Sequence, residues 1–317
     1  MTSSLARIAA PVTLCLATMS AVTMPLSGSG HTFGPARFKV QGSRFTVQGS
    51  RFKVQGSKFK VQGSSLRTEQ AGAALPKPVA CAVCWRPPLR LTWQLQLGGT
   101  LDPTVPAAMY EIDMFDDSAA QVADLHRLGR KAICYVDAGS WENWRPDAGK
   151  FPKSVLGKPL QGWKGERWLD VRRISVLGPI IRNRVRQCKA KGFDGVDFDN
   201  VDGYSNPTGF PLTGADQLRY DTFLANLAHT NALSVALKND PSQAKVLVKY
   251  FDWSVVEQCF QYQECARFSP FIRTGKPVFE VEYSLPLARF CKRAAALHFN
   301  SMRKHLNLGP WLRRCPP

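Results

Sequence analysis

The chain has 317 residues, a hydrophobic fraction of 44% and eight Trp, which suffice for a large core, and its net charge is +18. Residues 1–75 hold nine Lys or Arg and one acid, and the remaining bases are spread along helix-like stretches that suit solvated faces. Because no basic stripe is interleaved with aromatic residues, as single-strand binders require, the composition argues against a nucleic-acid partner.

The first 30 residues resemble a signal for export. A single base, Arg7, precedes an apolar run from Ile8 to Met24, which Pro11 and small polar residues interrupt. Nine Cys support the same interpretation, because disulfides persist in oxidising compartments. No later stretch approaches the ~20 apolar residues that a membrane-spanning helix needs. We therefore expect an extracytoplasmic protein (secreted, periplasmic or at the cell surface) without stable membrane insertion.

Residues 31–90 are predicted to form a low-complexity basic linker. Residues 37–64 contain four tandem seven-residue units, RFKVQGS, RFTVQGS, RFKVQGS and KFKVQGS. Phe and Val alternate as in a strand, but Gly-Ser ends each unit before a face can be buried, which indicates a disordered spacer. A tether to a surface or a polyanion is the alternative. Cys81 and Cys84 form a lone CxxC, which indicates a local disulfide or free thiols rather than a zinc site.

In residues 91–317 short apolar runs alternate with amphipathic segments, as in a parallel sheet covered by helices. The predicted strands are residues 92–97, 109–115, 131–139, 193–202, 233–240, 253–260 and 277–284, with a weaker eighth near 301–306. One helix is predicted to begin at Ser118 and to stop at Gly129, and another begins with Thr213-x-x-Asp216, an approximate capping box. Eight strands in about 220 residues favour a single-domain (β/α)8 TIM barrel. A doubly wound open sheet is the alternative, but no Gly-rich phosphate loop follows the first strand.

Most of the predicted strands end in polar or acidic residues. These residues are Asp113, Asp137, Asp197, Asp199, Asp202, Asn239, Asp240, Glu257 and Glu282. In a barrel the carboxyl ends of all strands converge on one face, where active sites are built. One acid at a strand end is ordinary, because Asp caps helices and turns, but its repetition along the chain favours an acidic active site.

The same region contains the strings WQLQLGG, YEIDMFD, ICYVDAGSWENWRPDA, GFDGVDFDNVDGY, TGFPLT, ALKND, VVEQCFQYQEC and VFEVEY, in order from Trp93 to Cys315. These strings resemble glycoside hydrolase family 114, the endo-α-1,4-polygalactosaminidases. The resemblance implies a (β/α)8 barrel that cuts α-1,4-linked galactosamine polymers. It places the family's catalytic carboxylates at Asp199, in DFDN, and at Glu257, in VVEQC. One departure is YEID, where the family commonly shows Tyr-Asp-Ile-Asp, but Asp113 is retained.

Glycoside cleavage needs one carboxyl group as proton donor and a second as nucleophile or base. We hypothesise an endo-acting, retaining enzyme with Asp199 as nucleophile and Glu257 as acid/base, because the shorter side chain suits a fixed attacking group. The structural alternatives are a cap or turn role for Asp199 and an ion pair with Lys238 for Glu257. Lys238 is also placed to keep Asp199 ionised, since a nearby cation lowers a carboxyl pKa.

The expected partner is a cationic galactosamine-containing polysaccharide. Its free amino groups carry charge, so an acidic cleft would attract it, and aromatic faces would stack on its sugars. The candidate substrate-binding residues are Trp93, Asp113, Tyr135, Asp137, Glu142, Asp197, Asn200, Asp202, Tyr204, Lys238, Asn239, Asp240, Glu282 and Tyr283. For the aromatic residues, core or rim packing is the alternative. Residues 140–175 exceed an ordinary loop between strand and helix, and we expect them to wall the cleft.

The remaining Cys and His residues indicate no further chemistry. The His residues lack ligand spacing, so we expect neither a metal nor another cofactor. We expect the pairs Cys259–Cys265 and Cys291–Cys315, and a monomer. Two other classes compete, a non-catalytic carbohydrate-binding barrel and a cationic surface or matrix-binding protein that acts through the repeats. The intact carboxylate pair argues against the first, and deletion of residues 1–75 separates the second from an enzyme.

Overall fold

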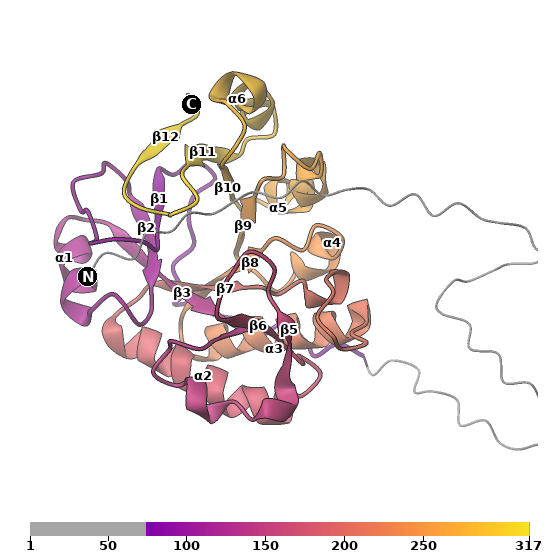
Figure 1. Ribbon diagram of the computed structural model, residues 1–317. Helices are drawn as coiled ribbons and strands as arrows, with labels where there is room; N and C mark the ends of the chain where they lie inside the picture. Colours follow the sequence, from indigo (N-terminus) through magenta and orange to yellow (C-terminus); the bar gives the residue numbers. More distant parts are fainter. Residues whose placement is uncertain (1–73, 317) are drawn as a thin grey trace, which may run out of the picture. The chain divides into compact units, whose positions relative to one another are not determined.

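The computed structural model describes residues 74–316 (Figure 1). The predicted export signal and the four repeats lie outside the described residues. The strands are β1 Trp93–Gln96, β2 Met109–Asp113, β3 Lys131–Asp137, β4 Ser140–Glu142, β5 Leu156–Pro159, β6 Glu166–Leu169, β7 Gly195–Asp199, β8 Ser234–Lys238, β9 Trp253–Glu257, β10 Val278–Glu282, β11 Asn300–Lys304 and β12 Leu312–Arg314. The helices are α1 Ala119–Arg127, α2 Ile174–Lys191, α3 Gly214–Thr230, α4 Ala244–Leu247, α5 Ser269–Arg273 and α6 Leu287–Ala296. Short 3-10 turns occupy Ala148–Lys150, Lys153–Val155, Gly203–Ser205 and Cys265–Phe268.

Eight parallel strands form the predicted barrel, in the order β1-β2-β3-β7-β8-β9-β10-β11. All eight predicted strands are confirmed, including the weak eighth, which is β11. β12 adds a ninth strand that runs antiparallel to β11. Side chains bridge β11 and β1, where Lys304 Nζ donates to Gln94 Oε1 over 2.6 Å and Trp93 Nε1 donates to the Asn300 carbonyl over 2.8 Å. The carboxyl ends of the eight parallel strands therefore surround one mouth.

Alternate residues of each strand point into the barrel, as the two-residue period of a strand requires. The lower layer of this interior is apolar and consists of Trp93, Leu95, Met109, Ile133, Ala236, Trp253, Val255, Phe279, Val281 and Met302. The same alternation places Glu111, Asp197, Asp199, Lys238 and Glu257 inside the barrel, nearer to the carboxyl ends of their strands. The barrel interior is thus apolar at the amino ends of the strands and ionic at the carboxyl ends.

Helices cover the outside of the barrel, and α2 and α3 pack side by side (Figure 1). The predicted caps are confirmed, because the side chains of Ser118 and Thr213 accept the backbone N–H groups of Gln121 and Asp216, and both capping boxes are complete. Apolar helix residues such as Leu125 are fully buried against the outward side chains of the strands. Local sequence therefore sets where these helices begin, and burial of one face holds them on the sheet.

The long segment after β3 forms a separate antiparallel sheet, in the order β4-β6-β5. Ser140 pairs with Trp168, and Glu142 pairs with Glu166 on the facing strand. Ser140 Oγ donates to Asp137 at the end of β3 and also lies 3.3 Å from Glu166 Oε2. One edge of the small sheet therefore lies beside the barrel mouth.

Four disulfides join described residues: Cys81–Cys84, Cys134–Cys188, Cys259–Cys265 and Cys291–Cys315. Both predicted pairs are confirmed, and Cys81 and Cys84 form the local disulfide rather than free thiols. The bond between Cys134 of β3 and Cys188 of α2 was not expected. Four disulfides are typical of a protein outside the reducing cytosol. Within residues 74–316 no helix combines the length and apolar character needed to cross a bilayer.

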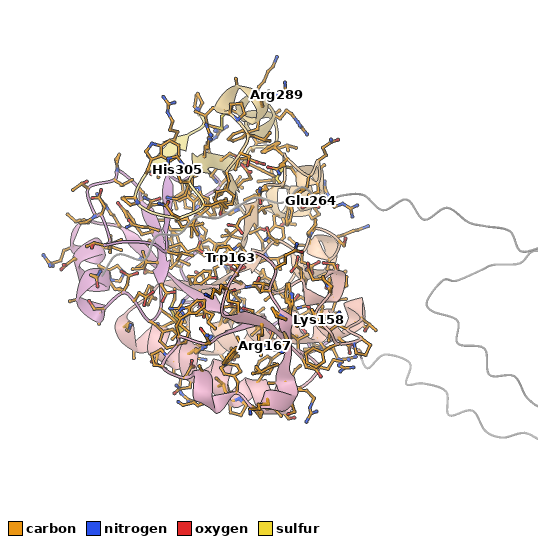
Figure 2. The ribbon with its side chains drawn as sticks, viewed as in Figure 1. Lys158, Trp163, Arg167, Glu264, Arg289 and His305 are labelled. Atoms are coloured by element: carbon orange, nitrogen blue, oxygen red, sulfur yellow. A yellow bond between two sulfur atoms is a disulfide. The ribbon has the colours of Figure 1, made fainter. Side chains whose placement is uncertain are left out.

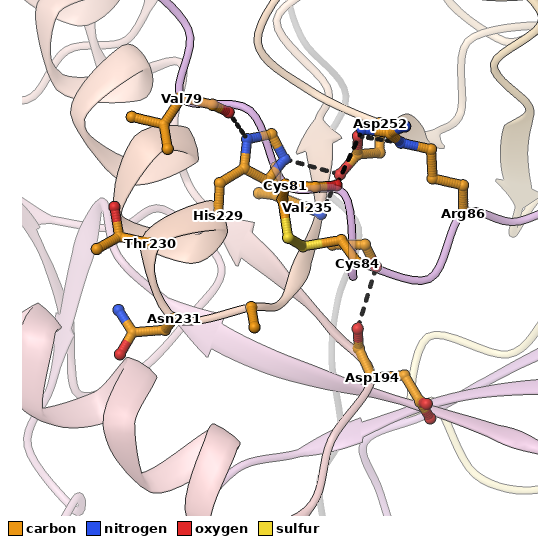
Figure 3. The surroundings of a disulfide bond; sticks show 12 residues. Val79, Cys81, Cys84, Arg86, Asp194, His229, Thr230, Asn231, Val235 and Asp252 are labelled. Atoms are coloured by element: carbon orange, nitrogen blue, oxygen red, sulfur yellow. Dashed lines mark hydrogen bonds and ion pairs between the residues drawn. A yellow bond between two sulfur atoms is a disulfide. The ribbon is translucent and has the colours of Figure 1, made fainter.

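The segment 74–90, which we assigned to the linker, lies against the barrel (Figure 3). His229 Nδ1 donates to the Val79 carbonyl over 2.8 Å, and its Nε2 lies 2.9 Å from Asp252 Oδ2. Arg86 Nε donates to the other oxygen of Asp252 over 3.3 Å. Contacts with the barrel therefore begin before the expected domain boundary.

Candidate active site

The predicted carboxylate pair meets at the carboxyl ends of neighbouring strands. Asp199, Lys238 and Glu257 are the last residues of β7, β8 and β9, and β8 lies between the other two strands. Lys238 Nζ lies 3.1 Å from Asp199 Oδ1 and 3.5 Å from Glu257 Oε2. These two oxygens are therefore no more than 6.6 Å apart, the sum of the two distances. This limit falls inside the range of about 5–9.5 Å in which paired carboxyl groups act on one glycosidic bond.

The charge of Asp199 is held by three donors. Besides Lys238, the Tyr135 hydroxyl donates to Asp199 Oδ2 over 2.7 Å, and the Asn200 backbone N–H donates to Oδ1 over 2.7 Å. Burial raises the pKa of Asp199, but the charge of Lys238 and these hydrogen bonds outweigh burial, so the pKa lies below the usual value. Asp199 is therefore ionised over the whole neutral range.

Glu257 is held from two neighbouring strands. The Tyr283 hydroxyl, just beyond β10, donates to Glu257 Oε1, and the Glu257 backbone N–H donates to Asn239 Oδ1 over 2.9 Å. The side chains of Asp199 and Glu257 are 19% and 24% exposed, whereas that of Lys238 is 3% exposed. A ligand in the mouth can therefore reach both carboxylates, while the amine lies below them.

Each of these three strands is followed by a residue with a left-handed backbone. Asn200, Asn239 and Gln258 have φ values of 61°, 48° and 58°. Such conformations are uncommon outside glycine and are concentrated at functional sites, where the surrounding structure holds them. The turn after each strand end therefore bends sharply away and leaves the preceding side chain at the mouth.

A second carboxyl pair lies one layer below the first. Glu111 and Asp197 are both fully buried. Burial raises the pKa of Asp197 to about 7 although Lys238 opposes it, and burial and repulsion by Asp197 raise that of Glu111 well above its usual value. Protonation of one acid lets the two carboxyl groups hydrogen-bond to each other. Asp197 was expected to bind substrate, and that prediction is corrected because a residue with no exposure supports the site from beneath.

Three other predicted acids form the rim beside the small sheet. Arg145 donates to Asp113 Oδ1 over 2.9 Å and forms an ion pair with Glu142 Oε1 at 2.8 Å. Asp137 Oδ2 accepts from Asn200 Nδ2 over 3.0 Å. Asp113, Asp137 and Glu142 are nearly buried, at 3–4% exposed. These acids are therefore engaged with protein partners, and Arg145 offsets part of their negative charge.

Glu166 of β6 belongs to the same rim and was not among the predicted residues. Burial and the nearby charges of Asp137, Glu142 and Asp199 raise its pKa to about 8. No strand was expected there, so the sequence offered no strand end to mark it. Although these acids are close together, no three His, Cys, Asp or Glu side chains in residues 74–316 are arranged as a metal site.

A cavity of about 340 Å³ opens next to Glu257. Its lining includes four predicted residues, Asp202, Tyr204, Asn239 and Asp240. The other lining residues are Ser205, Pro241, Ser242, Gln258, Tyr262 and Glu264, which follow the strand ends and carried no strand signal. The turns after β7, β8 and β9 therefore build one pocket beside the carboxylate pair.

Two predicted residues lie away from the mouth. Trp93, at the amino end of β1, is 2% exposed and packs on Phe279 in the lower apolar layer, so it cannot stack on a sugar. Glu282 points outward from β10 and is fully buried, and its Oε1 accepts the backbone N–H groups of Phe260 (2.9 Å) and Gln261 (3.1 Å). Glu282 therefore anchors the loop after Glu257 and does not contact the mouth.

Comparison with known proteins adds a family and related structures. The model of glycoside-hydrolase family GH114 matches residues 75–316. The crystal structure of Aspergillus fumigatus Ega3 in complex with galactosamine is similar, with 39% sequence identity and a TM-score of 0.72 over 76% of this chain and 100% of that chain. The glycoside hydrolase domain of PelA from Pseudomonas aeruginosa shares the fold, with 12% identity and a TM-score of 0.56 over 72% and 98% of the two chains. No curated protein matches the chain.

Proposed function

Since the chain belongs to glycoside-hydrolase family GH114, we propose that it hydrolyses α-1,4-linked galactosamine polysaccharides within the chain and with retention of configuration. The observation that carries this proposal is the position of Lys238 Nζ between Asp199 and Glu257, which keeps their nearest oxygens within 6.6 Å, the sum of 3.1 and 3.5 Å. The galactosamine in the Ega3 complex supports an aminosugar substrate. The acids at the mouth agree with a substrate whose free amino groups are cationic.

Asp199 is the proposed nucleophile. A carboxylate that attacks an anomeric carbon has to be ionised, and the low pKa of Asp199 meets this requirement. Lys238, Tyr135 and the Asn200 N–H fix its orientation. A charge held by three donors needs little rearrangement when the bond to the sugar forms.

Glu257 is the proposed acid/base. In the first step its carboxyl proton passes to the glycosidic oxygen as that oxygen leaves the anomeric carbon and Asp199 attacks from the opposite face. In the second step Glu257 removes a proton from a water molecule, which displaces Asp199 from the same carbon. Two inversions at one carbon give net retention.

The test of the catalytic pair compares three proteins on partly deacetylated galactosaminogalactan. We expect the wild type to release oligosaccharides, and Asp199→Asn and Glu257→Gln to be slower by about 10³-fold or more, in keeping with loss of a group that acts only in the transition state. Asp124→Asn, on the exposed face of α1, is the matched control and should equal wild type. If wild type is no faster than the two active-site variants, the catalytic proposal is lost.

Two further measurements address how the enzyme cuts. Proton NMR of the first-formed reducing ends should show the α configuration of the substrate, and the β anomer as first product would refute retention. Early products should be a range of oligosaccharides. Release of monosaccharide alone from the outset would exclude internal cleavage.

We also propose that the protein is exported and acts as a monomer. The four disulfides support an oxidising compartment. Fractionation of cells that express the full chain should place it outside the cytosol, and light scattering should give a mass near 35.2 kDa or less after any cleavage of the signal. Cytosolic retention or a dimer mass would contradict these two points respectively.

A further inference from the structure

We propose that the cavity beside Glu257 binds the sugar on the leaving-group side of the scissile bond, and that Asp240 makes this position selective for an unacetylated aminosugar. The inference rests on the proposed function, because it places a sugar relative to the nucleophile and the acid/base. It adds which side of the cleavage point is read, and by which residue.

The lining of the cavity gives the side. Of the two carboxylates, Glu257 lines the cavity. The acid/base donates its proton to the glycosidic oxygen, which departs with the leaving sugar, whereas the nucleophile meets the anomeric carbon of the other sugar. A cavity that extends from Glu257 along the turns after β8 and β9 therefore continues on the leaving-group side.

The cavity suits a single polar ring. Its volume of about 340 Å³ lies at the lower end of the range of about 300–1,000 Å³ that is usual for small-molecule sites. Tyr262 lies on its exposed edge, at 58% exposed, and offers a face for a sugar ring. Tyr204 lines another part of the wall.

The charge of the lining is wholly acidic. Asp202, Asp240, Glu257 and Glu264 line the cavity, and none of its lining residues is Lys, Arg or His. A sugar that carries an ammonium group supplies the opposite charge and three donors, whereas an N-acetyl group supplies no charge and adds bulk. The lining therefore favours the unacetylated sugar.

Asp240 is the acid that lacks a complete set of partners. It is 1% exposed, and its Oδ1 accepts the Tyr204 hydroxyl over 2.8 Å. Its Oδ2 is buried without a hydrogen-bond partner among residues 74–316. Burial, with repulsion by Asp202, raises the pKa of Asp240 to about 7. A buried carboxyl group with an unused oxygen is costly, and a bound ammonium would satisfy and ionise it.

The walls of the cavity are held in place before any ligand arrives. Asn239 and Asp240 are consecutive residues with left-handed backbones, at φ 48° and 50°. On the opposite wall, the loop that carries Tyr262 and Glu264 is closed by the Cys259–Cys265 disulfide. Glu264 follows this loop to the surface beside α5 (Figure 2). A preformed pocket loses little entropy when it binds, which favours discrimination between similar sugars.

The experiment uses a partly N-acetylated α-1,4-galactosamine polymer and sequences the products by mass spectrometry. Every cut creates one new reducing end, from the nucleophile side, and one new non-reducing end, from the leaving-group side. For wild type we expect unacetylated sugars to dominate the new non-reducing ends. Asp240→Asn should lower the ratio of unacetylated to acetylated sugar there by about tenfold, the scale of one charge-assisted hydrogen bond. The new reducing ends should keep their composition.

Three proteins accompany Asp240→Asn. Asn tolerates a left-handed backbone, so this substitution preserves the turn. Glu264→Gln tests the same cavity from its exposed wall and should lower the same ratio by about twofold to threefold, because a solvated charge contributes less. Asp124→Asn on α1 should leave both ends unchanged. Thermal unfolding establishes that each variant is folded, and Glu264→Gln decides the matter if Asp240→Asn is not.

The outcomes separate this inference from the proposed function. If wild type cuts the polymer but Asp240→Asn and Glu264→Gln leave the non-reducing ends unchanged, the inference is overturned and the hydrolase proposal stands. A change confined to the reducing ends overturns the assignment of the side. If wild type releases no oligosaccharides, the proposed function itself fails and this inference falls with it.

Discussion

Tyr135 donates its hydroxyl hydrogen to Asp199 Oδ2 over 2.7 Å, although the two residues are 64 positions apart in the chain. The contact follows from the pairing of β3 with β7, which aligns Asp137 with Asp199. Both side chains point into the barrel at its mouth. The hydroxyl thus stabilises the charged form of Asp199 specifically, and this can be measured.

Replacing Tyr135 by Phe should raise the pKa of Asp199 and slow the reaction. A hydrogen bond to a charged group contributes about 1.5–3 kcal/mol, so we expect kcat/KM to fall about 10-fold to 100-fold. Activity requires ionised Asp199, so a higher pKa moves the acidic limb of the pH profile of kcat/KM to higher pH. Tyr250→Phe, which loses only a bond to the Pro76 carbonyl, is the control. Coincident acidic limbs in wild type and Tyr135→Phe would contradict the prediction.

Replacing Lys238 by Met should destabilise the folded chain. The change leaves Asp199 and Glu257 without the cation between them, and breaking a buried ion pair costs about 3–5 kcal/mol. Protonation of the carboxylates relieves this loss, so the difference from wild type in urea unfolding should be larger at pH 7.5 than at pH 4. Adding Asp199→Asn to Lys238→Met should recover part of the stability. An equal loss at both pH values would point to packing rather than charge.

Removing the Glu282 side chain should loosen the loop after Glu257. Glu282→Ala loses two hydrogen bonds to backbone N–H groups, about 1–3 kcal/mol in total, whereas Glu282→Gln keeps an oxygen that accepts both. We expect Glu282→Ala to lower kcat/KM about tenfold and to speed hydrogen exchange at Phe260 and Gln261, and Glu282→Gln to stay close to wild type. Equal effects of the two substitutions would mean that the acceptor oxygen is not what matters.

The stability of the chain should fall as pH rises from about 5 to 8. Burial raises the pKa of Glu166 to about 8 and that of Asp137, Asp197 and Asp240 to about 7. The folded state therefore binds more protons than the unfolded state above pH ~4, and this stabilisation is lost as pH rises through the folded-state pKa values. We expect the free energy of unfolding to fall by about 1–3 kcal/mol per pH unit. A rise in urea-unfolding free energy over this range would contradict the prediction.

At lower pH the sign reverses. The pKa values of Asp199 and Asp252 lie below the usual value, so their stabilising effect is lost as pH falls below about 4. Stability should therefore pass through a maximum near pH ~5. Glu166→Gln serves as the control, because it should flatten the slope between pH 7 and 8 and leave the acidic side unchanged.

The sequence alone determined the elements of this protein, because their causes are local. Apolar runs of strand length predicted the eight barrel strands, and the cap residues Ser118 and Thr213 predicted the first turns of two helices. The strings around Asp199 and Glu257 identified both acids at strand ends. Each of these inferences depends on residues within a few positions of one another.

The tertiary structure decided which side chains form the site. Asp197 and Asp199 have the same strand parity, yet only Asp199 reaches the mouth, while Glu282 and Tyr283 are consecutive and face opposite sides of the sheet. Glu166 joins the rim through a strand that the sequence did not mark. Depth, facing and pKa depend on neighbours that strand register brings from distant parts of the chain, and those neighbours exist only once the barrel has closed.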